Sequence, residues 1–201
     1  GLAADASGGI FFEVGNGTFD ADSGGVDYGD SFVKLGIVGN VLNTTDYFTP
    51  FNQNALNVTD ADLGSGGCMV LPDSVNNPAH PHMLIGCGKE GKIYLIDRDQ
   101  MGHFNPNNDN QIVQSIAGQI GGTWSTPAFF NNKVYFNGIG DTLKAFQFIN
   151  GLLTPNPVSH SNTQLGYPGA TPVISANGNT NGIVWTLKTR SEEHTSELQS
   201  H

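Results

Sequence analysis

The chain has 201 residues with a formal net charge of −10; only 13% of them are charged, and 27 are glycine. A chain of this length can bury the core of one domain. The acidic balance argues against nucleic acid or an anionic membrane as a partner. There is also no run of about 20 apolar residues that would span a membrane.

Apolar runs rich in β-branched and aromatic residues recur along the chain, and Gly, Asn, Asp or Pro bound each of them. Such runs predict strands, and helical periodicity is almost absent. In chain order the runs are "GIFFEVGNG" at 9–17, "GCMVLP" at 67–72, "HMLIGCG" at 82–88, "KIYLIDRD" at 92–99, "STPAFF" at 125–130, "KVYFNG" at 133–138, "TLKAFQF" at 142–148, "ATPVIS" at 170–175 and "GIVWTLKT" at 182–189.

These runs form repeating units. Each unit reads strand, loop, strand, tight turn and strand, and the units recur at intervals of roughly 45 to 70 residues. A shift of 50 residues superposes Gly88 on Gly138 and Ile96 on Phe146. A second shift, of 73 residues, superposes "FFEVGNG" on "LIGCGKE".

The long repeat discriminates among three architectures: a β-sandwich, a parallel α/β sheet and a β-propeller. A β-sandwich would give strands without such a repeat, and a parallel α/β sheet would need helices between the strands. A β-propeller, with one small antiparallel sheet per blade, fits best. We therefore predict that residues 1–189 form a partial β-propeller domain of about four blades, with the first and last blades incomplete.

Gly86, Gly88 and Gly91 spell G-x-G-x-x-G, the pattern of a dinucleotide-binding turn. That turn needs a helix after its last glycine, because the N-terminus of the helix supplies the N–H groups for a pyrophosphate. A strand-like run follows here instead. The three glycines are therefore predicted to lie in a hairpin of one sheet, and no nucleotide is expected.

The last twelve residues, "RSEEHTSELQSH" at 190–201, contain three glutamates after a long stretch that is poor in glutamate. The segment resembles the in-frame translation of a common short-read sequencing adapter. We expect it to be a non-native tail and exclude it from the fold. The alternative is a C-terminal helix capped by Ser191 ahead of Glu193.

Residues 89–98, "KEGKIYLIDR", match a K-x-G-x-x-Y-x-[LI]-D-R pattern. In this stretch the chain resembles the quinoprotein dehydrogenase family, whose β-propellers bind pyrroloquinoline quinone (PQQ) and calcium. The Lys or Arg that opens the pattern contacts the quinone in that family, so the resemblance assigns Lys89 to the cofactor. The resemblance runs along residues 1–189 and is strongest between Gly15 and Asp99.

The resemblance also implies a metal ligand. Family members place a calcium-ligating Asn in a glycine-rich turn after a strand, and Asn16 occupies the corresponding turn here. The 73-residue shift places Asn16 on Lys89, and equivalent repeat positions lie at the same height on the same rim. Both side chains are therefore expected to face one site. The next repeat has Ile139 at this position, which cannot bind a polar cofactor.

Further matches concern the base and an aromatic residue. "YGDSFVKLG" at 28–36 and "DYFTP" at 46–50 resemble the next two segments of the family, which carries a catalytic aspartate just beyond the second. Asp60 and Asp62 are the nearest candidates for that base. Trp124 corresponds to the tryptophan of an Asn-Trp pair near the quinone, although Thr123 replaces the Asn.

Each candidate also has a simpler structural explanation. Lys89 suits an exposed hairpin turn, and Asn16 suits a turn with positive φ. Asp60 and Asp62 are typical of an Asx turn ahead of a glycine-rich stretch. Trp124 is equally explained as a residue that packs between blades.

The implied chemistry needs these residue types. Calcium takes six to eight oxygen ligands and polarises a quinone carbonyl. A carboxylate removes the alcohol proton while hydride moves to the quinone, and a cation beside the ring stabilises the developing charge. The resemblance implies a periplasmic or secreted bacterial oxidoreductase that acts on an alcohol or sugar. The alternative is a non-catalytic propeller scaffold that binds a protein or ligand, so the sequence leaves open whether the chain is an enzyme.

Overall fold

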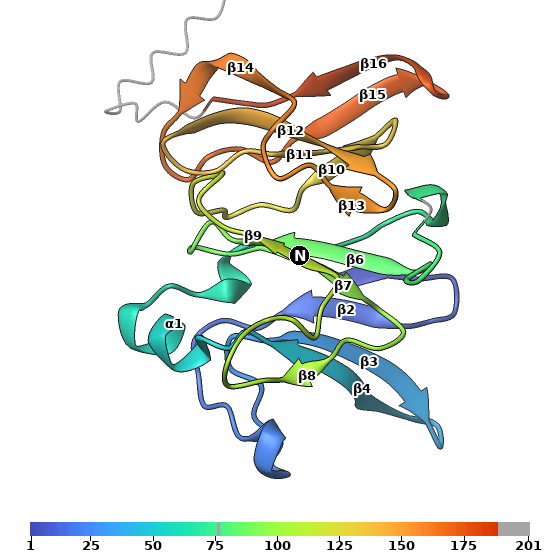
Figure 1. Cartoon of the computed structure of the whole chain (residues 1–201), viewed down its shortest axis with the longest axis vertical. Coiled ribbons are helices and arrows are strands. Elements are labelled where there is room, and N and C mark those ends of the chain that lie inside the picture. The colour runs from blue at the N-terminus through green and yellow to red at the C-terminus, as the bar shows by residue number, and fades with distance from the viewer. Residues whose placement is uncertain (76, 189–201) are drawn as a thin grey trace, which may run out of the picture.

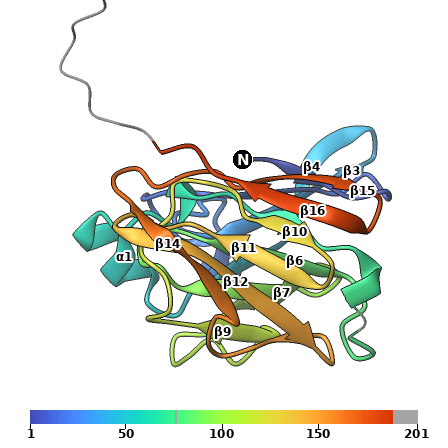
Figure 2. The same cartoon turned by 90° about the horizontal axis from the view of Figure 1, so that it is seen from above.

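A computed structural model of the chain describes residues 1–75 and 77–188, and the expected non-native tail at 190–201 lies outside these residues. The described part is mostly β, as predicted. Its sheets follow one another in chain order along the long axis (Figure 1) and overlap when viewed along that axis (Figure 2). None of the sheets formed by these residues closes on itself.

The first sheet contains an antiparallel meander of four strands. The first strand of this sheet is only two alanines long. A short fifth strand pairs parallel with the fourth. In order, the strands are β1 (Ala3–Ala4), β2 (Ile10–Glu13), β3 (Phe32–Val38), β4 (Val41–Thr49) and β8 (His103–Phe104).

The next sheets repeat the meander. The second consists of β5 (Met69–Val70), β6 (Met83–Cys87), β7 (Ile93–Asp97) and β9 (Gln114–Ile116). The third consists of β10 (Ala128–Phe130), β11 (Lys133–Phe136) and β12 (Asp141–Ile149), with β13 (Leu152–Leu153) and β14 (Ser159–Leu165) both paired to β12. The last, as described, has two strands, β15 (Val173–Asn177) and β16 (Thr180–Trp185).

The 50-residue repeat holds at the level of strand register. Residues that pair between β6 and β7 have counterparts, 50 positions later, that pair between β11 and β12. The two sheets therefore place equivalent side chains at equivalent points. The pairs are Leu84 with Ile96 and Ile85 with Leu95 in the second sheet, and Val134 with Phe146 and Tyr135 with Ala145 in the third.

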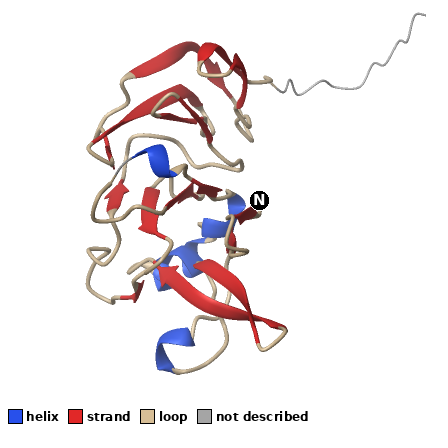
Figure 3. Cartoon of the chain, turned by 90° about the vertical axis from the view of Figure 1, so that its right-hand side faces the viewer, coloured by secondary structure: helices blue, strands red, loops and turns tan. Residues whose placement is uncertain are grey.

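Helices are short and confined to the connections between strands (Figure 3). The longest, α1 (Gln53–Thr59), was not expected, because only Gln53 and Leu56 of its seven residues are buried and its apolar periodicity is weak. It ends at Asp60, whose backbone is left-handed with φ of 57°. The remaining helical segments are the single turns η1 (Ala21–Ser23), η2 (Leu63–Ser65) and η3 (Asp73–Val75).

The second sheet is buried on both faces, which explains why β6 reads as one continuous apolar run. Ile85 and Leu95 pack towards the third sheet, within a cluster that includes Phe136. Leu84 and Tyr94 point the other way, into a cluster shared with the first sheet. Burying a large apolar side chain contributes about 1.5–3 kcal/mol, so these two layers hold the stack together.

Because the strands alternate in direction, the connections fall at two edges. The Lys89 rim carries the turns at 14–31, 88–92 and 137–140 and the sheet-to-sheet crossings at 50–68 and 117–127. The opposite rim carries the other turns, among them 39–40, 131–132, 150–151 and 178–179. In Figure 1, α1 lies at the left on the Lys89 rim, and the tip of the β3–β4 hairpin lies at the right on the opposite rim.

A buried ion pair anchors the crossing from the first sheet to the second. Lys92 Nζ lies 2.5 Å from Asp109 Oδ2, and both side chains are largely buried. The ammonium group also lies 5.1 Å from the ring centroids of Phe51 and Tyr94. Asp109 accepts a further hydrogen bond from the backbone N–H of Phe51 at 2.9 Å, so the pair links β7, the loop before β9 and the end of β4.

We expect Lys92→Met to lower the free energy of unfolding by about 3–5 kcal/mol, because it leaves the Asp109 carboxylate buried without its cation. Chemical denaturation measures the loss. Lys133→Met is the matched control: Lys133 makes no ion pair or cation–π contact among the described residues, and its change should stay within about 0.5 kcal/mol. Equal losses in the two variants would contradict the role given to the pair.

Candidate ligand site at the Lys89 rim

The Lys89 rim brings together four of the five residues singled out from the sequence. Lys89 lies in the turn between β6 and β7, and Asn16 lies in the turn after β2. Asp60 and Asp62 lie on the crossing between the first and second sheets, where Asp60 ends α1 and Asp62 precedes η2. Three separate segments of the chain therefore meet at one point.

The four residues are joined directly by hydrogen bonds and ion pairs. Lys89 Nζ donates to Asp60 Oδ2 at 3.0 Å and to the Asp60 carbonyl oxygen at 2.9 Å. It also forms an ion pair with the Asp62 carboxylate. Asn16 Nδ2 donates to Asp60 Oδ1 at 3.1 Å. Each aspartate therefore contacts both Asn16 and Lys89, and the four residues form a closed cluster.

Asp62 is the common acceptor for the two turns. Its Oδ1 accepts the backbone N–H of Asn16 at 2.8 Å, and its carbonyl oxygen accepts the backbone N–H of Lys89 at 3.0 Å. The next repeat uses the same backbone contact, in which Ile139 N–H donates to the Gly122 carbonyl oxygen at 2.8 Å. The side chains of Asn16 and Lys89 both contact Asp60, so the two repeat-equivalent residues lie together on this rim.

The charges of the cluster stabilise one another. Burial alone would raise the pKa of Asp62, but the hydrogen bonds from Lys89 Nζ and from the Asn16 N–H outweigh it and hold the pKa below its ordinary value of 3.8. Hydrogen bonds to Asp62 and Asp60 raise the pKa of Lys89. At neutral pH the cluster is therefore an ion pair, and Asp62 is ionised but weakened as a proton acceptor.

Asp30 belongs to the site, although the sequence did not single it out. Its side chain is fully buried and its backbone is left-handed, with φ of 51°. Oδ1 accepts the backbone N–H of Leu63 at 3.0 Å, whereas Oδ2 has no hydrogen-bond partner in the described part of the chain. Burial, together with the negative charge of Asp62, raises the pKa of Asp30. In the sequence Asp30 reads as an ordinary turn residue after Gly29.

Glu13 is a second buried carboxyl group that sequence reasoning missed. Both of its side-chain oxygens are buried and lack a hydrogen-bond partner within the described residues. Burial raises the pKa of Glu13 well above its ordinary value of 4.5, so the group favours its neutral form. A Cβ atom on Gly86 would overlap Glu13 Oε1, so Gly86 leaves the room that this side chain occupies.

The G-x-G-x-x-G glycines serve the hairpin, as predicted. β6 ends at Cys87 and β7 begins at Ile93, with no helix between or directly after them. Gly91 has φ of +72°, and a side chain there would also meet the Ile120 carbonyl oxygen. These requirements come from turn geometry and from packing against the next crossing, and not from a phosphate.

Trp124, the fifth predicted residue, lines a separate pocket. Its ring packs edge-on against Tyr167, with centroids 5.3 Å apart, and it lines an apolar pocket together with Pro168 and Trp185. Among the described residues, Trp124 makes no hydrogen bond or ring contact with the Lys89 cluster. The neighbouring Thr123 faces the second sheet instead, where its N–H donates to the Gly88 carbonyl oxygen at 3.0 Å.

The site fits calcium in its donor chemistry. Asn16 Oδ1 and Asp30 Oδ2 are buried oxygen atoms without partners within residues 1–75 and 77–188, and calcium prefers such hard ligands. Asp60 and Asp62 contact the one ammonium of Lys89, and the charges of Asp62 and Lys89 also act on the buried Asp30, so a divalent cation suits the local charge. The same residues contain no ready cluster of three or more His, Cys, Asp or Glu side chains for a metal. An ion would therefore rely on the Asn16 amide and on other oxygens.

The sequence matches no protein-family model and no curated protein. The resemblance to quinoprotein dehydrogenases therefore rests on the motifs at 9–17, 28–36, 46–50 and 89–98. No helix in the described residues is long and apolar enough to cross a membrane.

We expect Glu13→Gln to flatten the pH dependence of stability. Because the folded-state pKa of Glu13 is raised, its contribution is fully present below about pH 4.5 and is lost as the pH rises through the folded value. The variant should therefore lose less stability than the wild type in urea denaturation as the pH rises above the ordinary value of 4.5. An unchanged pH profile would mean that Glu13 does not titrate as a buried group.

Proposed function

We propose that the chain is part of a quinoprotein-type β-propeller and that its Lys89 rim carries the cofactor site of an exported alcohol or sugar oxidoreductase. The successive sheets would then be blades, with β1, β5, β10 and β15 nearest the axis. In support, β1 contacts β5 and β10 contacts β15 across neighbouring sheets. The shared register of the second and third sheets also supports a blade repeat.

The observation that carries the proposal is the convergence at Asp62. The sequence pointed to Asn16, Lys89 and the two aspartates separately, through a family pattern and a repeat. Asn16 and Lys89 each contact both aspartates on one rim, although the four residues come from segments up to 73 residues apart in the sequence. A purely local role for each residue would not require this arrangement.

In this proposal each side chain of the site has its own role. Asn16 and Asp30 would offer their oxygens to calcium, and Lys89 would contact PQQ. When bound, PQQ supplies an electron-accepting quinone, and calcium supplies a Lewis acid that polarises it. Asp62 would accept the hydroxyl proton of the substrate. Its basicity increases whenever Lys89 turns from Asp62 towards another acceptor, because that hydrogen bond helps to hold the pKa of Asp62 down.

One observation favours a second function, a non-catalytic propeller scaffold. Lys89 Nζ already has three oxygen acceptors, two on Asp60 and one on Asp62, which match its three hydrogens. Such a saturated cluster locks two turns to a crossing and presents a rigid rim. A rigid rim suits a protein or ligand partner, without redox chemistry.

The deciding experiment uses the protein at its full natural length. Calorimetry with PQQ in the presence of calcium measures cofactor binding, and dye reduction on addition of alcohols and sugars measures turnover. We expect binding at micromolar PQQ that depends on calcium and is lost in Lys89→Met. Lys133→Met, which removes a lysine from β11, should bind as the wild type does.

The outcomes separate the two functions. Calcium-dependent binding with substrate-dependent dye reduction supports the oxidoreductase. Failure of the wild-type protein to bind micromolar PQQ leaves the scaffold, and binding that survives Lys89→Met would refute the role proposed for Lys89.

A further inference from the structure

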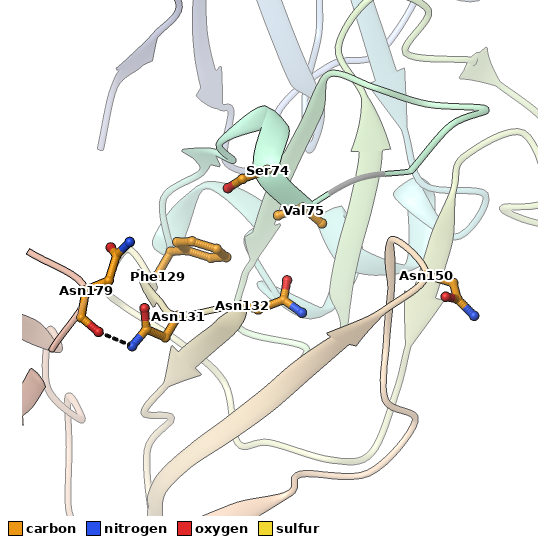
Figure 4. A pocket seen from close by; sticks show the side chains of 7 residues that line it. All are labelled: Ser74, Val75, Phe129, Asn131, Asn132, Asn150 and Asn179. Carbon is orange, nitrogen blue, oxygen red and sulfur yellow. Dashed lines mark hydrogen bonds between the residues drawn. The ribbon is translucent and has the colours of Figure 1, made fainter.

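A second pocket lies on the opposite rim, at the far end of the strands from Lys89. Its volume is about 620 Å³, within the range of small-molecule sites. Figure 4 shows the lining side chains spread from Asn179 on one side to Asn150 on the other, with the Phe129 ring between Ser74 and Asn131. The lining residues are Ser74, Val75, Phe129, Asn131, Asn132, Asn150 and Asn179.

Three sheets contribute to this pocket. Asn131 and Asn132 form the turn between β10 and β11, and Asn150 begins the turn between β12 and β13. Asn179 lies in the turn between β15 and β16, and η3 closes the pocket from the second sheet. The pocket therefore depends on the stacking of consecutive sheets and is not a feature of one hairpin.

The lining is polar but carries no ionisable side chain. A carboxamide both donates and accepts hydrogen bonds, as does a hydroxyl group. Asn131 Nδ2 donates to the Asn179 carbonyl oxygen at 2.8 Å, and Asn132 Nδ2 donates to the Phe148 carbonyl oxygen at 2.7 Å. These bonds orient both amides and leave their Oδ1 atoms open. The Asn150 and Asn179 side chains make no hydrogen bond within the described residues.

Turn geometry accounts for part of this asparagine cluster but not for all of it. Asn131, Asn132 and Asn150 have left-handed backbones, with φ of 47°, 60° and 51°, and asparagine tolerates that region well. Asn179 has no such backbone, because the positive φ values of its turn fall on Gly178 and Asn181. A smaller residue would serve this turn equally well, so turn geometry does not explain the Asn179 side chain.

Phe129 provides an apolar wall. Its ring is partly buried and packs on the core beside Phe148, with centroids 6.2 Å apart, which holds it in place. An aromatic face combined with neutral donors and acceptors matches a sugar ring, which has an apolar C–H face and a hydroxyl edge. A charged ligand would find no counter-charge among the side chains that line the pocket.

We propose that this pocket binds a neutral oligosaccharide. Hydroxyl groups would bond to the open amide groups of Asn132, Asn150 and Asn179, and one ring would lie against Phe129. The pocket volume of about 620 Å³ leaves room for more than one sugar ring, so a short chain of sugars suits it better than a single ring. The pocket is on the opposite rim from Lys89, so the proposal does not depend on the oxidoreductase.

Isothermal titration calorimetry with maltotriose, cellotriose and tri-N-acetylchitotriose tests this on the full-length protein. We expect saturable binding of at least one of these neutral trisaccharides and weaker binding of trigalacturonate. The variant Asn150→Gly/Asn179→Ala should weaken binding about tenfold, because it removes two amides that make no internal hydrogen bond. Glycine at 150 keeps the left-handed backbone.

Asn40→Gly is the matched control, since Asn40 also has a left-handed backbone, with φ of 67°, but lies in the β3–β4 turn outside the pocket. It should bind as the wild type does. Independently of any variant, the bound trisaccharide should shift the side-chain amide NMR signals of Asn132 and Asn179. The proposal is overturned if none of the neutral trisaccharides binds at millimolar concentration, if the double variant binds normally, or if trigalacturonate binds most tightly.

Discussion

Asp62 is the point on which the Lys89 rim depends. Its carboxylate and its carbonyl oxygen together accept the backbone N–H groups of Asn16 and Lys89 and the Lys89 ammonium. One residue on a crossing therefore sets the positions of the turns that end β2 and β6. These turns belong to two different sheets, which pack through the cluster around Leu84 and Tyr94. Packing brings the sheets together, and Asp62 fixes how their rims meet.

The two rims of the molecule differ in chemistry because their turns differ. On the Lys89 rim, one lysine pairs with the Asp60 and Asp62 carboxylates, and the buried Asp30 and Glu13 lie on the same rim. On the opposite rim, the pocket is lined by amides and one aromatic ring, without charge. A rim of coupled charges suits a cation or a proton transfer, whereas a neutral rim suits a ligand that is recognised by shape and hydroxyl groups. The same stack of sheets positions the residues of both rims.

Much of this could be predicted from the sequence. The β-branched and aromatic runs predicted most strands, and the 50-residue repeat predicted the shared register of Ile96 and Phe146. Other features escaped prediction for physical reasons. α1 has only two buried residues and a weak apolar periodicity, so its sequence does not mark it as a helix. Glu13 reads as the polar face of a strand, because its burial depends on the space that Gly86 leaves 73 residues later.

The most direct test is the pKa of the Asp62 carboxyl group, measured by following its side-chain carbon in NMR titrations of the wild type and of Lys89→Met. With Lys89 present, the pKa should lie below the ordinary value of 3.8. Without it, the pKa should rise, because burial is then opposed only by the backbone N–H groups of Asn16 and Asp62. The same pKa in both proteins would contradict the account, since Asp62 and Lys89 would then not be coupled.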